Sequence, residues 1–281
     1  MNLNLQNTPI YRAGSKKDQI HKIRKLLPNE INNFYDLFGG TGIVCINSGA
    51  KIKHLNELDV NTYKLYKYFQ NDFNNKILSD FEEYKKKHVN DTDTFLKNAL
   101  LDFKRTNNIK YLYYVTLSSY CNMYEFNKNG DVIASLGKKI NNTKIKYYHN
   151  LNGINLTNLN YDQVFEFKDL TKKDFVFIDP PYLISSATNK KKYGYTWTKQ
   201  DEIKLLDFIQ KLIDNDINFM LTNYLTRKNE TNELLNDFIQ KNKIKRTILS
   251  EEKNLYSGNI IEVLEIAVYN YIPSMEQVSL F

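Results

Sequence analysis

The sequence predicts an α/β fold built on a mostly parallel sheet, with one segment of different character inserted into it. Strand-like and helix-like segments alternate near the start of the 281-residue chain and again after about residue 160. The segment 174–178 is almost wholly apolar, which is typical of a central parallel strand buried on both faces. The length suits one such domain carrying an insert.

The first part of the predicted core follows from apolar spacing and from the residues that interrupt it. A basic amphipathic stretch, 16–27, predicts a helix that ends at Pro28. Residues 33–38 predict a buried strand, which Gly39-Gly40-Thr41-Gly42 ends in a turn. The next elements expected are a short helix, a strand and a helix, at 43–47, 51–58 and 60–69.

The predicted insert, 71–160, differs from the core in texture. Charged helices are expected at 77–89 and 92–105, and a hairpin with long loops at 126–139, where Gly and Asn punctuate the chain. The predicted core comprises 1–70 and 161–281. Its later elements are strands at 174–178 and 217–221, helices at 199–213 and 230–239, and an antiparallel pair at 244–249 and 260–271.

Composition excludes several classes of protein. Hydrophobic residues make up 42% of the chain and charged residues 25%, which is globular composition rather than disorder. The net charge of +7 permits a polyanionic partner but is weak support for one, because it comes almost wholly from lysine. No apolar run is long enough to span a membrane, and Met1–Ile10 does not resemble a secretion signal. Cys45 and Cys121 form no metal-ligand pattern, so a cytoplasmic protein without a metal is expected.

The glycine turn after the first strand predicts a nucleotide site. Glycines let the backbone approach a ligand closely, and open α/β sheets bind nucleotides at the carboxyl ends of their strands. Glu57 and Asp59 end the next strand, where a carboxylate can accept ribose hydroxyls. The third spaced glycine of the dinucleotide pattern is missing, which argues against NAD. A glycine cap loop with two surface acids is the alternative interpretation.

A second strand end, Asp179-Pro180-Pro181-Tyr182, predicts recognition of an amino group. The two prolines make the loop rigid and remove two backbone donors. A carboxylate beside a backbone carbonyl offers two acceptors, which an exocyclic NH2 requires, and Tyr182 offers a face for a planar base. A proline-rich loop without chemistry is the alternative, which the buried apolar strand before it disfavours.

These motifs together resemble the Dam-like, D12-class DNA adenine-N6 methyltransferases, in the family's order and over nearly the whole chain. Asp179–Tyr182 is similar to the catalytic tetrapeptide without change, and Asp36–Gly42 resembles the Asp-x-Phe-x-Gly-x-Gly motif. Tyr11–Lys16 resembles the N-terminal cofactor motif, Asp59-Val60-Asn61 an Asp-Ile-Asn segment, and Glu166-Phe167 the pair that contacts the cofactor's adenine.

The resemblance implies a mixed, seven-stranded, Rossmann-like sheet and methyl transfer from S-adenosylmethionine to N6 of a flipped adenine in duplex DNA, by a monomer. The catalytic residues it implies are Asp179, Pro180, Pro181 and Tyr182. The cofactor-binding residues it implies are Tyr11, Ala13, Gly14, Lys16, Asp36, Phe38, Gly40, Gly42, Glu57, Asp59, Glu166, Phe167 and Asp179. The alternatives are methylation of cytosine N4 or of RNA, and an inactive DNA-binding module of the same fold.

Within the insert, residues 120–131 resemble the family's target-recognition hairpin. The residues expected to contact DNA there are Asn122, Tyr124, Glu125 and Asn127. Glu125 stands where the family's GATC methylases carry a guanine-reading arginine, and glutamate instead prefers the amino groups of cytosine or adenine. We therefore predict a target other than GATC; a solvent-facing Glu125 is the alternative. Phosphate contacts are expected from Lys138, Lys139, Lys190, Lys191 and Lys192.

The last five residues suggest a docking peptide. Gln277-Val278-Ser279-Leu280-Phe281 resembles the pentapeptide with which replication and repair proteins bind the bacterial sliding clamp. A flexible tail, 273–281, could place Leu280 and Phe281 in an apolar groove of that partner. The alternative is that these two side chains pack on the protein's own core.

Overall fold

The computed structural model describes residues 5–12, 14–72, 76–88, 91–184, 197–228, 230–256 and 259–273. Gln277–Phe281, Ala13 and Lys190–Lys192 therefore lie outside the described residues. None of the described helices combines the length and the apolar character that crossing a membrane requires. The free cysteines are a buried Cys45 and an exposed Cys121.

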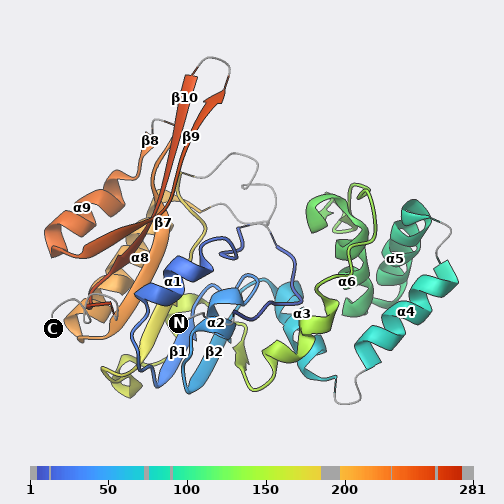
Figure 1. Cartoon of the computed structure of the whole chain (residues 1–281), viewed down its shortest axis with the longest axis horizontal. Helices are drawn as coiled ribbons and strands as arrows, with labels where there is room; N and C mark the ends of the chain where they lie inside the picture. The colour runs from blue at the N-terminus through green and yellow to red at the C-terminus, as the bar shows by residue number, and fades with distance from the viewer. Residues whose placement is uncertain are drawn as a thin grey trace.

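A mixed sheet forms the centre of the molecule (Figure 1). Its strand order is β5-β2-β1-β6-β7-β10-β9, and the short β8 pairs with β7. The first five strands of this order pair in parallel, whereas β10 is antiparallel to both β7 and β9. This confirms the predicted mixed sheet of seven strands, with β8 as an added edge. The strands are β1 Asn33–Asp36, β2 Ile52–Asn56, β5 Asn155–Thr157, β6 Phe175–Ile178, β7 Asn218–Arg227, β8 Glu230–Thr231, β9 Lys245–Tyr256 and β10 Asn259–Tyr269.

Helices cover both faces of the sheet because the central strands bury alternate side chains on opposite faces. In β6, Phe175 and Phe177 belong to one apolar cluster, and Val176 and Ile178 to the other. The first cluster includes residues of α1 (Ile20–Leu26), α2 (Ile43–Asn47) and α3 (Val60–Gln70); the second includes α8 (Lys199–Asp214) and α9 (Glu233–Asn242). The predicted 230–239 helix begins later than expected, since residues 230 and 231 form β8.

The segment between α3 and β5 forms a lobe beside the sheet, as Figure 1 shows. Its helices are α4 Lys76–His88, α5 Thr92–Thr106 and α6 Ile109–Ser118, followed by the small hairpin β3 Glu125–Phe126 and β4 Val132–Ile133. Tyr113 and Tyr114 are buried in α6. The sheet resumes at Asn155, inside the predicted insert 71–160, because β5 pairs with β2.

The N-terminal segment ties the lobe to the sheet. The Tyr113 hydroxyl donates to the carbonyl of Pro9 at 3.0 Å, and the Asn150 amide donates to the carbonyl of Asn7 at 2.7 Å. The Tyr11 hydroxyl donates to the carbonyl of Asn141 at 3.1 Å. Residues 7–11 are thus hydrogen-bonded to the inserted segment. The loop that follows them in the chain contains Arg12 and Lys16, which line the site described below.

Candidate active site

A cavity of about 910 Å³ lies at the carboxyl ends of β1, β2 and β6. Parallel strands bring their carboxyl ends to one edge of a sheet, so the loops that follow them share a crevice. The glycine turn, the acids after β2 and the Asp179–Tyr182 loop all line this cavity. Two motifs that are more than a hundred residues apart in sequence therefore face the same space.

Asp179 is held by three donors that come from different elements. Its Oδ1 lies 2.7 Å from Lys16 Nζ and accepts hydrogen bonds from Thr222 Oγ1 at 2.6 Å and Tyr182 Oη at 3.0 Å. Thr222 lies in β7, next to β6 in the sheet, and Lys16 in the loop before α1. Charge-assisted hydrogen bonds of this length hold the carboxylate in one orientation at the cavity wall.

Tyr182 is held at its hydroxyl and at its ring. The hydroxyl lies 2.7 Å from Glu265 Oε1 as well as near Asp179. The ring packs edge-on against Tyr224, with centroids 4.6 Å apart, and Lys16 Nζ lies 5.1 Å from the Tyr182 ring centroid. Burial, followed by the charges of Asp179 and Glu265, raises the pKa of Tyr182 well above its ordinary value, so the phenol stays protonated.

Lys16 is a buried cation between two carboxylates. Its Nζ lies 3.5 Å from Glu265 Oε1 in addition to its contact with Asp179, and its side chain is 7% exposed. Burial alone would lower the pKa of Lys16. The charges of Asp179 and Glu265 outweigh burial and raise that pKa above its ordinary value. The ammonium group therefore remains charged and cannot act as a base.

The other end of the cavity holds a second group of charges. Glu57 Oε2 accepts from the backbone N–H of Gly40 at 2.9 Å, and Glu57 Oε1 from that of Asp59 at 2.9 Å. Arg12 Nη1 lies 3.3 Å from Glu57 Oε2 and 3.5 Å from Asp59 Oδ2. The side chain of Asp59 is 33% exposed against 8% for Glu57, so Asp59 is the more accessible acceptor.

The glycine turn reaches these acids only because it lacks side chains. A Cβ on Gly39 would lie 2.7 Å from Leu55 Cδ1 and 2.9 Å from the carbonyl oxygen of Asn56. Gly40 has a φ of +56°, which places its N–H toward Glu57. Gly39 therefore lets the turn pack closely against the end of β2.

Asp36 supplies a buried carboxylate with an unused oxygen. Asp36 is 2% exposed, and its Oδ1 has no hydrogen-bond partner among the described residues. Burial, together with the charges of Asp179 and Glu57, raises the pKa of Asp36 well above its ordinary value. Asp36 is among the residues that line the cavity.

We expect Asp36→Asn to stabilise the protein at neutral pH. The pKa of Asp36 is higher in the folded protein than in the unfolded chain. The wild type therefore loses stability as the pH rises from the unfolded-state pKa to the folded-state pKa. Asparagine does not titrate, so its stability advantage over the wild type should be larger at pH 8 than at pH 5. Urea unfolding of both proteins at the two pH values measures this; an advantage that shrinks with pH contradicts it.

Comparison with protein families identifies the chain. Residues 13–252 match the D12 class of N6 adenine-specific DNA methyltransferases. The chain belongs to this family. It is 29% identical over 268 residues to modification methylase StsI of Streptococcus sanguinis, which covers 90% of this chain and 40% of that protein. It is 27% identical over 280 residues to the type II methyltransferase M.FokI of Planomicrobium okeanokoites, covering 94% of this chain and 43% of that protein.

A third relative is of similar length to this chain. The type II methyltransferase M1.LlaDCHI of Lactococcus lactis subsp. cremoris is 23% identical over 278 residues, which cover 92% of this chain and 93% of that protein. The chain thus spans about two fifths of StsI and M.FokI but nearly all of M1.LlaDCHI.

Most of the residues that the D12 resemblance implied for the cofactor or for catalysis line the main cavity. Those that line it are Gly14, Lys16, Asp36, Phe38, Gly40, Glu57, Asp59, Asp179, Pro180, Pro181 and Tyr182. Tyr11, Gly42, Glu166 and Phe167 are not among its lining residues. Tyr11 bonds to the inserted segment, and Phe167 packs against Phe165 and Phe208. Asn160–Gln163, which follow β5, line the cavity where Glu166 and Phe167 were expected.

Sequence reasoning on the D12-class chain missed three side chains of the site. Arg12 takes the position directly before Ala13, where the family motif has its aromatic residue, so that departure was a usable signal. Thr222 directly follows the predicted strand 217–221 and lies in β7. No sequence motif pointed to Glu265, which lies within an antiparallel strand and outside the family-matched residues 13–252.

The hairpin residues divide into supports and exposed groups. Asn127 Oδ1 accepts from the backbone N–H groups of Asn129 and Asp131, both at 2.9 Å, so this side chain shapes the turn. Asn122 Nδ2 donates to the carbonyl of Thr116 at 2.7 Å. Burial, then the charge of Asp59, raises the pKa of Tyr124 above its ordinary value. Glu125 is exposed.

Lys138 and Lys139 are also exposed.

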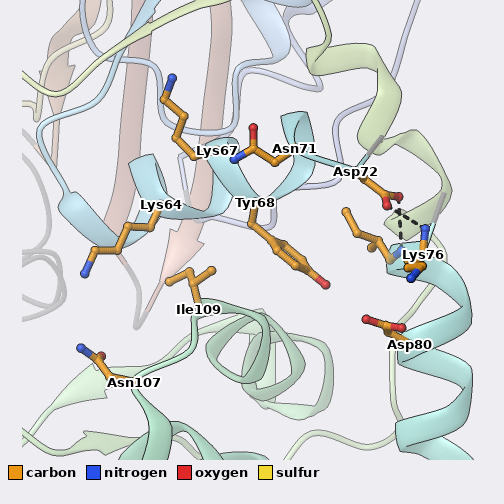
Figure 2. Close-up of a pocket in the computed structure, with 10 residues that line it drawn as sticks. Lys64, Lys67, Tyr68, Asn71, Asp72, Lys76, Asp80, Asn107 and Ile109 are labelled. Carbon is orange, nitrogen blue, oxygen red and sulfur yellow. Dashed lines mark hydrogen bonds between the residues drawn. The ribbon is translucent and has the colours of Figure 1, made fainter. Parts of the chain in front are cut away.

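A smaller cavity, of about 440 Å³, lies where α3 meets α4 and the start of α6 (Figure 2). Figure 2 shows Tyr68 pointing into it from α3. Asp72 in its wall accepts from the backbone N–H of Lys76 at 2.7 Å, which caps the start of α4. It contains none of the residues that the family motifs implied for catalysis or cofactor binding.

Proposed function

We propose that this D12-class chain transfers the methyl group of S-adenosylmethionine to N6 of a flipped adenine in duplex DNA. The single observation that carries the proposal is the placement of Asp179 on the wall of a cavity that also contains Asp36, Glu57 and Asp59. Family membership supports the same reaction.

The side chains around the cavity fit the proposed cofactor. S-adenosylmethionine carries an ammonium group, a sulfonium and two ribose hydroxyls, and it supplies an electrophilic methyl group when bound. Asp36, an acid among the lining residues, suits the cationic part. Asp59, the more exposed of the two acids after β2, suits the hydroxyls, with Glu57 behind it. Arg12 would orient both acids.

Asp179 and the Pro180 carbonyl would recognise the target amine. A base within a duplex cannot present its amino nitrogen to the cavity, so it must be flipped out at a cost of a few kcal/mol. The two amino hydrogens would be accepted by Asp179 and Pro180, which draws nitrogen electron density toward the methyl group. Tyr182 would stack on the base. Asp179 Oδ2, to which none of the three donors described above is directed, would accept the departing proton.

A label-transfer assay tests the proposal. The protein is incubated with tritiated S-adenosylmethionine and unmethylated duplex DNA, with RNA as the competing substrate. Label recovered as N6-methyladenine in DNA is the expected result. Label in N4-methylcytosine or in RNA would replace the proposal with one of its alternatives, and no label at all would favour the inactive DNA-binding module.

Methyl-specific sequencing of DNA from cells that express only this enzyme would identify the target. We propose that the target is not GATC, because Glu125 lacks the donors that read guanine. Modified adenines are therefore expected in another sequence. Methylation confined to GATC would contradict this proposal.

We further propose, from the sequence pattern alone, that Gln277–Phe281 binds the bacterial sliding clamp. Deleting these five residues should abolish binding to purified clamp and leave methylation of short oligonucleotides unchanged. Surface plasmon resonance with immobilised clamp measures the first effect. Clamp binding that survives the deletion would end this proposal.

A further inference from the structure

Glu265 is a buried carboxylate that the reaction described above does not use. It lies in β10 and is 5% exposed. Burial of a carboxylate costs free energy unless hydrogen bonds or opposite charges compensate it. Glu265 lies outside the family-matched residues 13–252. The groups that compensate its burial must therefore be found among its own contacts in this structure.

The strand is irregular where Glu265 occurs. The register of β10 with β7 shifts between Leu264 and Glu265, and its register with β9 shifts between Glu265 and Ile266. Irregularities of this kind re-aim side chains and are common beside active sites. Here they occur on both sides of the one residue whose carboxylate lines the cavity from β10.

Both carboxylate oxygens of Glu265 have partners, and each oxygen has different ones. Oε2 accepts from Gln19 Nε2 and Ser250 Oγ, each at 3.2 Å. Oε1 faces Tyr182 Oη at 2.7 Å and Lys16 Nζ at 3.5 Å. One oxygen is thus anchored to the scaffold, and the other holds two groups that also contact Asp179.

Oε1 of Glu265 shares its two hydrogen-bond donors with Asp179. Lys16 has three N–H groups and three oxygen neighbours, at Gly14, Asp179 and Glu265. Tyr182 has one O–H proton, which lies between the oxygens of Asp179 and Glu265. Glu265 therefore shares with Asp179 both the charge of Lys16 and the proton of Tyr182. Without its negative charge, Lys16 would be drawn fully onto Asp179.

We propose that Glu265 is a positioning residue for methyl transfer, which holds Lys16 and Tyr182 so that Asp179 keeps its orientation and its capacity to accept the target amine. The inference rests on the function proposed above. Glu265 does not touch the reacting atoms; it acts through the two side chains that it shares with Asp179.

The test compares Glu265→Gln with Glu262→Gln. Glutamine keeps the shape of residue 265 and can still bond Tyr182, but it removes the charge. Glu262 is exposed in the same strand and is the matched control. Three quantities are measured: the single-turnover rate of methyl transfer to unmethylated duplex DNA, the Kd for S-adenosylhomocysteine and the melting temperature.

For Glu265→Gln we expect the single-turnover rate to fall about tenfold to a hundredfold while the Kd stays within about threefold of wild type. Glu262→Gln should match wild type in all three quantities. An unchanged rate in Glu265→Gln, or a rate that falls only in proportion to weaker cofactor binding or lower melting temperature, would overturn the inference alone. A wild-type protein that transfers no methyl group would overturn the proposed function and the inference with it.

Discussion

Replacing Asp179 with alanine is expected to lower methyl transfer by a factor of at least about 10³ and to leave DNA binding within a few-fold of wild type. The substitution removes the acceptor for the target amine and, at the same time, the oxygen that Lys16, Tyr182 and Thr222 all contact. Because the hairpin and the exposed lysines are untouched, the contacts proposed for DNA remain.

Methyl transfer from tritiated S-adenosylmethionine and an electrophoretic DNA-binding assay measure the two effects. Asp207→Ala is the matched control, since Asp207 is exposed in α8 and does not line the cavity. An Asp179→Ala protein that retains methylation would remove the basis of the proposed function. A variant that loses DNA binding to the same extent would show that Asp179 acts before the chemical step.

Replacing Lys16 with methionine is expected to have the largest effect on stability. Methionine is similar in length, but it leaves the carboxylates of Asp179 and Glu265 facing the half-buried Tyr182 without a cation. Removing one partner of a buried ion cluster costs about 3–5 kcal/mol of unfolding free energy. For a chain of this size, the melting temperature should fall by roughly 10 °C. Calorimetry measures the melting temperature, and urea titration the free energy.

A second substitution separates charge from packing. In the double variant Lys16→Met/Glu265→Gln, one of the two uncompensated carboxylates is gone, so at least about half of the lost stability should return. Lys17→Met is the control, since Lys17 is exposed beside Lys16 in the same loop. A double variant less stable than the Lys16→Met protein would mean that packing of the lysine stem, and not its charge, carries the effect.

Most core elements of the sheet could be predicted from sequence because each depends on local patterns. The α2 helix agrees with its predicted bounds, 43–47, since Gly42 and the apolar run define it within a few residues. Strand β5 escaped prediction because its three residues are too few to show a periodicity, and only pairing with β2 makes them a strand.

The candidate site divides in the same way. Asp36, Asp59 and Asp179 each stand at the end of a recognisable strand, so sequence alone could place them at one edge of a sheet. The partners that hold them do not follow from such a pattern. Arg12 reaches Glu57 and Asp59 across 45 or more residues, and Glu265 reaches Tyr182 from a strand 83 residues away in sequence.

By itself, the sequence determined the class of sheet, the two motifs at its carboxyl edge and the resemblance to the D12 methyltransferases, because strand ends and rigid turns are written in neighbouring residues. The tertiary structure alone decided how the charges of the site are balanced. Lys16 lies between Asp179 and Glu265 only after β10 pairs with β7 and the N-terminal loop folds across the strand ends. Hydrogen bonds and ion pairs act over a few ångströms in space, a distance that sequence separation does not encode.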